Sequence, residues 1–355
     1  MSASDMADSD FPATTSGVIA MINLESQIES DQRRSESSVA QQIASIERLL
    51  LRGTFCGRIA DNEKAAALAE RMVEDFPNTG DAYLARARTR CCFHVFSLAL
   101  ADLDRAQEYG TDQQVLEDER AGVFQAVGRY DEALLIRQEA ARRSCTFQTT
   151  AALATLYGER RDLDLAERFF EEGKAQYHGV SPFPLAMLDF QRGHLWHAED
   201  QLPRARTWYL AALKRLPEFA AAQGHLAEVD AALGDVEAAI ARLRRVVNVS
   251  DDPEFPAQLA WVLQSSGRTE ESHSLLAQCA ARYDKLTREH LEAFADHAAE
   301  FWLANGAGAE HALRYAEANF SIRQTPRALN LLKRAQHASS SRHRVAQTTS
   351  CPEGG

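Results

Sequence analysis

The sequence predicts an all-α fold, an array of about seven or eight stacked helical hairpins. The first observation is a small residue that recurs along most of the chain, at Ala65, Ala99, Ala133, Ala166, Ala205, Ala239, Ser272 and Ala312. Successive spacings are 34, 34, 33, 39, 34, 33 and 40 residues, so five of the seven are 33 or 34. The two longer spacings, of 39 and 40 residues, must contain insertions into the repeat pattern.

The second observation is the order of residue types in the clearest copy, residues 187–219. Small and aromatic residues alternate and a proline follows: Gly193, Trp196, a break at Asp200–Pro203, then Ala205, Tyr209, Ala212 and Pro217. Small residues let the two helices of a hairpin cross closely, and the aromatic residues fill the gap to the next hairpin. Proline ends the second helix because it has no N–H to donate and disfavours helix in the preceding residue. This order resembles the tetratricopeptide repeat, W-x2-L-G-x2-Y…A-x3-F…P over 34 residues.

The resemblance covers roughly Val39 to Ala338 and implies a right-handed superhelix of hairpins. Repeat one has Arg52 where the family usually has leucine, so we expect a capping unit there. A helix over Pro326–Ala338 is expected to cover the last repeat, because a terminal unit needs a polar outer face. The insertion around Tyr177–Ala186 contains two prolines and a glycine, which predicts a loop or a helix extension.

Three segments are predicted. Residues 1–37 are acidic and are expected to be disordered, with a short helix at Gly17–Glu29 as the alternative. Residues 38–338 form the repeat array, and residues 339–355 are expected to be a disordered tail.

Composition and charge indicate which classes of partner to expect. The formal net charge of −12 disfavours binding to nucleic acid or to anionic membranes. The sequence contains no apolar run of about 18 residues, so no membrane span is expected. The N-terminus lacks the basic start and apolar core of a secretory signal. Six cysteines without a C-x-x-C pair favour reduced thiols, so we expect a cytoplasmic protein.

The resemblance also implies where a partner would bind. In the family, the first helices line the concave face and four repeat positions usually point into the groove. Carried over by register, repeats five to eight contribute Phe190, His194, His197, Glu228, Trp261, Gln264, Phe294, His297 and Phe301. Repeats two and three contribute the more polar set Arg88, Cys91, Asp118 and Gln125. If the register is shifted by one residue, Trp261 or Phe301 packs between helices instead.

The sequence disfavours one known binding mode of the family. Some members grip the C-terminal carboxylate of heat-shock chaperones with a clamp of Lys, Asn, Asn, Lys and Arg. The matching positions here hold Leu50, Thr54, Ala85, Val115 and Glu119, so none of the clamp residues is present.

Catalysis has little support in the sequence. No phosphate-binding G-x-x-x-x-G-K-[ST], dinucleotide-binding or G-x-S-x-G motif occurs. His194 and His197 share a helix face and Glu228 could approach from the next repeat, but a zinc site normally needs further ligands and a second shell. We therefore predict that the protein is not an enzyme and binds neither a cofactor nor a metal ion.

The resemblance implies a non-catalytic scaffold that holds a peptide or a partner helix in its groove. Two alternatives stay open: a self-associating or accessory subunit of a larger complex, and a metal-dependent enzyme that uses His194, His197 and Glu228. The sequence does not identify the partner.

Overall fold

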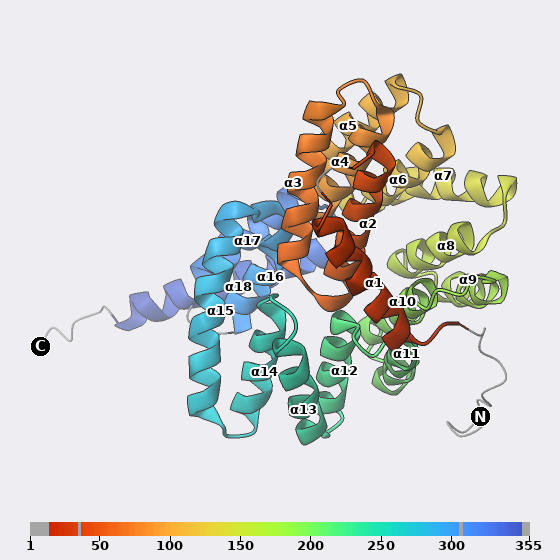
Figure 1. The fold of residues 1–355 in the computed structure, drawn as a ribbon. Coiled ribbons are helices and arrows are strands. Elements are labelled where there is room, and N and C mark those ends of the chain that lie inside the picture. The colour runs from red at the N-terminus through yellow and green to blue at the C-terminus, as the bar shows by residue number, and fades with distance from the viewer. Residues whose placement is uncertain (1–13, 35–36, 305–307, 350–355) are drawn as a thin grey trace, which may run out of the picture. The chain divides into compact units, whose positions relative to one another are not determined.

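The computed structural model describes residues 14–34, 37–304 and 308–349. In that part of the chain it contains eighteen helices and no strand (Figure 1). The prediction of an all-α fold is confirmed.

Sixteen of the helices follow one another along the chain as the first and second helices of the eight predicted repeats. In chain order, the first and second helices are α2 (Val39–Cys56) with α3 (Ile59–Asp75), α4 (Gly80–Cys92) with α5 (Phe96–Glu108), α6 (Gln113–Val127) with α7 (Tyr130–Arg143), α8 (Phe147–Glu159) with α9 (Leu163–Gln176), α10 (Phe183–Ala198) with α11 (Leu202–Arg215), α12 (Ala220–Ala232) with α13 (Val236–Val247), α14 (Glu254–Ser265) with α15 (Thr269–Glu289), and α16 (Leu291–Ala304) with α17 (Ala309–Ile322). Helix α1 (Gly17–Gln32) precedes the hairpins and α18 (Pro326–Thr349) follows them.

The recurring small residue of each repeat is completely buried. All eight of these residues, from Ala65 to Ala312, have a relative exposure of 0%. A larger side chain at such a position would overpack the crossing between the two helices, which typically costs about 1–3 kcal/mol. The repeat therefore follows from a steric requirement on one residue per hairpin.

The two long spacings have different structural causes. Between repeats four and five, residues 177–182 form a loop that joins α9 to α10. Between repeats seven and eight, the extra length lies in α15, which has 21 residues. The first insertion is thus a loop and the second is a helix extension.

The predictions of disorder for the two segments that flank the array need correction. Helix α1 buries Met21, Leu24 and Ile28, so the part of residues 1–37 from Gly17 onward is ordered and the helical alternative holds. Its buried residues recur at helical spacing, and this apolar face packs on α2. At the other end, α18 continues to Thr349, so the predicted helix end at Ala338 and a disordered tail from 339 are wrong. Residues 1–13 and 350–355 lie outside the described residues.

Contacts divide the chain into two compact units. Unit 1 comprises residues 1–65 and 134–266, and unit 2 comprises residues 66–133 and 267–355. Each unit therefore combines two stretches that are separated along the chain.

In unit 1, repeat one packs against repeats five and six through an aromatic cluster. The ring of Phe55, near the end of α2, lies 5.1 Å from the ring of Phe183 and 4.7 Å from that of Phe219. Phe219 is 1% exposed and directly precedes α12. Buried aromatic pairs at these centroid distances contribute more than their buried area alone.

The turn after α2 completes this contact. Gly57 has φ +61°, and a Cβ atom there would lie 2.7 Å from Ser250 Oγ and 2.8 Å from the ring of Phe255. Glycine is required on both counts, since only it combines left-handed backbone with so close an approach. The Asp251 carboxylate then accepts hydrogen bonds from the N–H groups of Ile59 at 2.6 Å and Ala60 at 3.0 Å. A residue some 190 positions away along the chain thus caps the start of α3.

Arg52, which stands where the repeat pattern usually has leucine, has an acidic partner. It forms a two-pronged ion pair with Asp61, with Nε at 2.7 Å and Nη2 at 3.0 Å from the carboxylate oxygens. Asp61 is 2% exposed, so its charge requires such a partner. Arg52 therefore links the two helices of repeat one.

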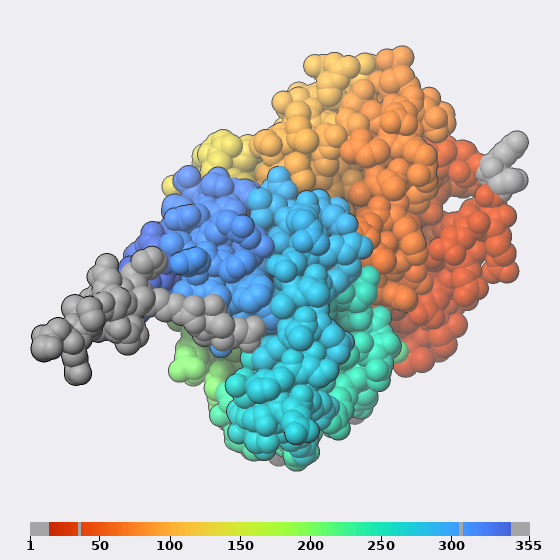
Figure 2. Space-filling view, turned by 90° about the vertical axis from the view of Figure 1, so that its left-hand side faces the viewer, coloured from red at the N-terminus to blue at the C-terminus, as the bar shows by residue number. Residues whose placement is uncertain are grey.

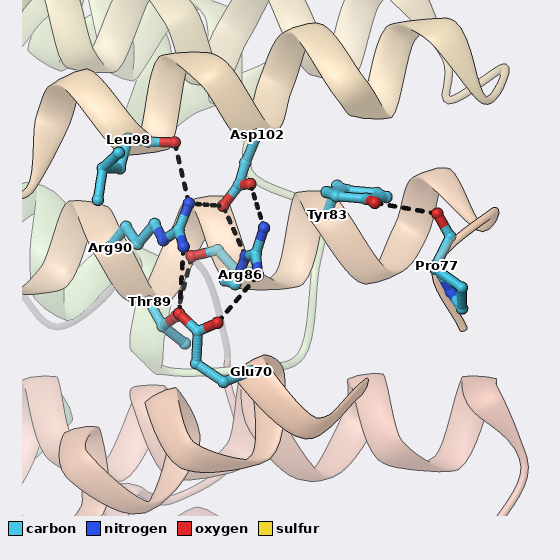
Figure 3. A network of polar contacts seen from close by, with 8 residues as sticks. All are labelled: Glu70, Pro77, Tyr83, Arg86, Thr89, Arg90, Leu98 and Asp102. Atoms are coloured by element: carbon cyan, nitrogen blue, oxygen red, sulfur yellow. Dashed lines mark hydrogen bonds and ion pairs between the residues drawn. The ribbon is translucent and has the colours of Figure 1, made fainter. Parts of the chain in front are cut away.

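Unit 2 contains a related ion-pair network between α3, α4 and α5 (Figure 3). The carboxylate of Asp102, 2% exposed, lies 2.7 Å from the guanidinium groups of both Arg86 and Arg90. Both arginines also bind Glu70 on α3, at 2.9 and 3.3 Å. Breaking such a network by removing one partner leaves a buried charge uncompensated, which is strongly destabilising.

Residues far apart in sequence also meet in unit 2. The backbone N–H of Gln324 donates to the carbonyl of Val127 at 3.1 Å, and Arg323 Nε donates to the carbonyl of Ala126. Figure 2 shows the blue of the C-terminal helices beside the yellow of this segment. His94, in the α4–α5 turn, places Nδ1 3.2 Å from the carbonyl oxygen of Glu292.

We expect Asp251→Ala to lower the free energy of unfolding by about 1–2 kcal/mol, because two N–H groups at the start of α3 lose their acceptor. The matched control is Asp235→Ala, since Asp235 stands at the N-cap of α13 without a side-chain cap bond. Urea denaturation followed by circular dichroism measures both. Equal losses in the two variants would show that the long-range cap contributes nothing.

We also expect a pH-dependent stability from His94. Burial, reinforced by the charge of Arg323, lowers the pKa of His94 from 6.5 to about 4. The unfolded chain therefore binds the proton first as pH falls. This contribution is complete above about pH 6.5 and is lost toward about pH 4, by up to about 3 kcal/mol.

Urea midpoints measured across this range test the effect, with His94→Asn as the variant because asparagine tolerates the left-handed backbone at this position, φ 56°. The wild type should lose stability more steeply than the variant. Asp296 does not confuse the window, since its pKa is depressed to about 2 and its contribution is lost only below about pH 4. Parallel pH profiles would contradict the assignment.

Candidate functional site

Three consecutive first helices of unit 1 present aromatic and polar side chains at helical spacing. Residues three or four apart share one face of a helix, so each helix contributes a short row. The side chains are Phe190, His194 and His197 on α10, His225 and Glu228 on α12, and Gln258 and Trp261 on α14. Tyr209 joins them from α11.

Tyr209 is positioned by a glycine. A Cβ atom at Gly193 would lie 2.6 Å from the Tyr209 ring, so only glycine leaves room for it. The tyrosine is fully buried, and its hydroxyl lies 3.2 Å from Nδ1 of His197. The small residue of the repeat pattern therefore orients a histidine one turn further along α10.

His225 is the centre of the group that we call the imidazole cluster: Phe190, His194, His197, Tyr209, His225 and Glu228. Its ring centroid lies 5.5 Å from that of His194, 5.8 Å from that of His197 and 5.7 Å from those of Phe190 and Tyr209. His225 was not among the residues predicted from the sequence. The available signal was its position three residues before Glu228, on the same face of α12.

Glu228 is held by two groups of different chemistry. His225 Nδ1 lies 2.9 Å from Oε2, and Gln258 Nε2 donates to Oε1 at 3.0 Å. Burial raises the pKa of Glu228, but the hydrogen bond from His225 and the charges of His225 and His197 outweigh it and lower the pKa overall. Glu228 is therefore ionised at neutral pH.

His197 has the opposite tendency. Burial lowers its pKa by more than the nearby carboxylate of Glu228 raises it. The neutral ring has one protonated nitrogen and one lone pair, so it can donate to one group while accepting from, or ligating, another.

A hollow of about 250 Å³ adjoins the cluster and is lined by Glu228, Gln258, Trp261 and Val262 together with Ala231, Leu243 and Ser265. Apolar walls with one carboxylate and one amide are typical of sites that take an apolar group beside a polar one. Trp261 is half-buried at the wall, and Gln264 is exposed further along α14.

The structure does not bring all the predicted groove residues together. Phe190, His194, His197 and Glu228 form one cluster with Trp261 at its edge, whereas Phe294, His297 and Phe301 lie on α16 in unit 2. Phe301 is 0% exposed and packs against Tyr283 and Trp302. Its prediction as a groove residue is wrong, because its side chain fills the core between helices.

The polar set of repeats two and three is largely engaged in the fold. Arg88 Nε donates to Glu119 at 2.6 Å, and Gln125 is buried. Burial raises the pKa of the Cys91 thiol to about 12, which disfavours the reactive thiolate. Asp118 is exposed.

Comparison with known proteins supports the fold. Human IFIT1, solved as a dimer with m7Gppp-AAAA, matches 93% of this chain and 78% of its own with a TM-score of 0.55 and 14% identity. A tetratricopeptide repeat protein from Parabacteroides merdae matches 67% of this chain and 93% of its own, with a TM-score of 0.44 and 12% identity. The chain is built of tetratricopeptide-like repeats.

A further comparison covers only part of the other protein's length. Cut9, from the APC/C hetero-tetramer Cut9–Hcn1, matches 90% of this chain with a TM-score of 0.47 and 16% identity, and this chain spans 52% of it. No protein-family model and no curated protein sequence matches. At these identities the likeness concerns the fold alone.

Among the described residues, no helix is both long enough and apolar enough to cross a membrane.

The different burial of two predicted groove residues leads to a stability test. Phe301→Ala should lower the free energy of unfolding by about 3–5 kcal/mol, because it empties a fully buried site. Trp261→Ala should cost no more than about 2 kcal/mol, because the side chain is partly exposed. Chemical denaturation measures both, and equal costs would place Trp261 in the core as well.

Proposed function

We propose that this tetratricopeptide-like array is a non-catalytic scaffold that binds a peptide or a helix of a protein partner on the face formed by α10, α12 and α14. The observation that carries the proposal is the imidazole cluster beside the hollow at Trp261. Partly exposed aromatic groups around a hollow supply the anchor points at which most binding energy is usually concentrated.

The chemistry of the face suggests what the partner presents. Leu243, Val262 and the Trp261 ring favour an apolar side chain in the hollow. The ionised Glu228 carboxylate, at the same hollow, favours a hydrogen-bond donor or a positive charge beside that side chain. An apolar residue next to a basic residue on a helix or extended peptide would match both features.

A protein partner is favoured over nucleic acid. The net charge of −12 repels phosphate, and Glu228 would face it directly. The m7Gppp-AAAA named for human IFIT1 therefore does not carry over to this chain. The cytoplasmic location predicted from the sequence stays a prediction.

Self-association is the second candidate, and one observation favours it. On α1, Val18, Ile19 and Ile22 are 47%, 52% and 55% exposed and lie on one side of the helix. Exposed apolar groups in a row are a common feature of protein interfaces. This surface is separate from the residues of the imidazole cluster.

The scaffold proposal predicts that Trp261→Ala abolishes capture of a partner from lysate of the source cells, because the wall of the hollow is lost. Leu233→Ala is the matched control, since Leu233 is a 48% exposed apolar residue at the end of α12, outside the hollow. Affinity capture with mass spectrometry compares the two with the wild type, and circular dichroism confirms that both are folded.

A partner retained by Trp261→Ala would remove the hollow from the binding surface. Capture of further copies of the chain alone, together with a dimer mass by light scattering, would favour self-association. Val18→Glu should then restore the monomer, and a dimer that survives it would exclude the α1 surface.

A further inference from the structure

Three potential metal ligands of unit 1 converge in the imidazole cluster. The ligating atoms of His197, His225 and Glu228 all lie within 4.8 Å of one another. His197 comes from α10 and the other two from α12, so the convergence is a product of hairpin stacking. His194, which shares a helix face with His197 in the sequence, does not belong to this group of three.

The donor set has a definite preference among cations. Two imidazole nitrogens and one carboxylate oxygen suit borderline transition metals, whereas Mg²⁺ and Ca²⁺ favour oxygen ligands throughout. Two histidines and a glutamate are one of the protein ligand sets of zinc, with at least one coordination position left open to water.

The groups behind the three ligands are also suitable. The Tyr209 hydroxyl lies 3.2 Å from Nδ1 of His197, and a hydrogen bond there would direct a metal ion to Nε2 of the same ring. Gln258 donates to Oε1 of Glu228, while Oε2 faces His225. Such outer partners fix the orientation and tautomer of metal ligands, and the buried Tyr209 ring cannot move without disturbing the close contact at Gly193.

We propose that His197, His225 and Glu228 form a binding site for one Zn²⁺ ion. Zinc–nitrogen and zinc–oxygen distances of about 2.0–2.2 Å place neighbouring ligand atoms about 3.3–3.6 Å apart in a tetrahedral site. Small side-chain rotations bring atoms from within 4.8 Å to this separation. The ion replaces the direct hydrogen bond between His225 and Glu228, and this site does not depend on the scaffold function.

The test uses the full-length protein, stripped of metal with a chelator and desalted, and zinc chloride as the probe. Titration calorimetry should show one equivalent of Zn²⁺ per chain. We expect His225→Ala and Glu228→Gln each to weaken binding at least about tenfold, since each removes one of three ligands. His194→Ala is the matched control: it removes an imidazole of the same cluster that is not a ligand, and it should bind as the wild type does.

Tyr209→Phe distinguishes ligation of Zn²⁺ by His197 from a non-specific attraction of Zn²⁺ to the imidazole cluster. It keeps the ring but removes the hydroxyl behind His197, so zinc affinity should fall while the stoichiometry stays at one. Circular dichroism shows whether each variant is folded, and Glu228→Gln, which keeps the side-chain shape, decides the matter if His225→Ala does not fold. Absence of zinc uptake by the wild type, or equal affinity in the wild type and Glu228→Gln, would overturn the proposal. So would an equal loss in His194→Ala.

Discussion

The close crossing of the two helices in each hairpin is the constraint on which the rest of the structure depends. The small residue of each of the eight repeats has no exposed surface, so a side chain with more volume there would overpack the surrounding core. In unit 1, the first helices α12 and α14 are in contact, and rings on α10 and α12 lie 5.8 Å apart. His197 and His225 are brought together by this stacking, since they occupy facing rows on α10 and α12.

The charges of the chain differ in how they are compensated. Asp61 and Asp102 are buried against arginines, and Asp189 pairs with Arg215 at 2.7 Å. Guanidinium groups stay charged at all relevant pH values, so these pairs are structural. Glu228 is partnered by an imidazole and an amide instead. Because these partners can release the carboxylate to a new ligand at lower cost, Glu228 is better suited to binding than these three aspartates.

Contacts between distant segments complete each unit. The aromatic contact of Phe55 with Phe183 and Phe219 covers the end of α2, and the Asp251 cap satisfies the start of α3. These contacts cover an end of repeat one that would otherwise lack packing and hydrogen-bond partners. A terminal hairpin has no sequence neighbour on one side, so it needs such cover.

The sequence by itself determined the all-α class, an array of about seven or eight hairpins and the recurring small residue, because these features depend on spacing along the chain. The tertiary structure decided what depends on contacts between distant residues: the packing of α1, the burial of Phe301 and the meeting of His225 with His197 and Glu228. A one-residue error in register exchanges a groove position for a core position, and periodicity does not resolve it. A ligand set drawn from two helices is fixed only when those helices pack.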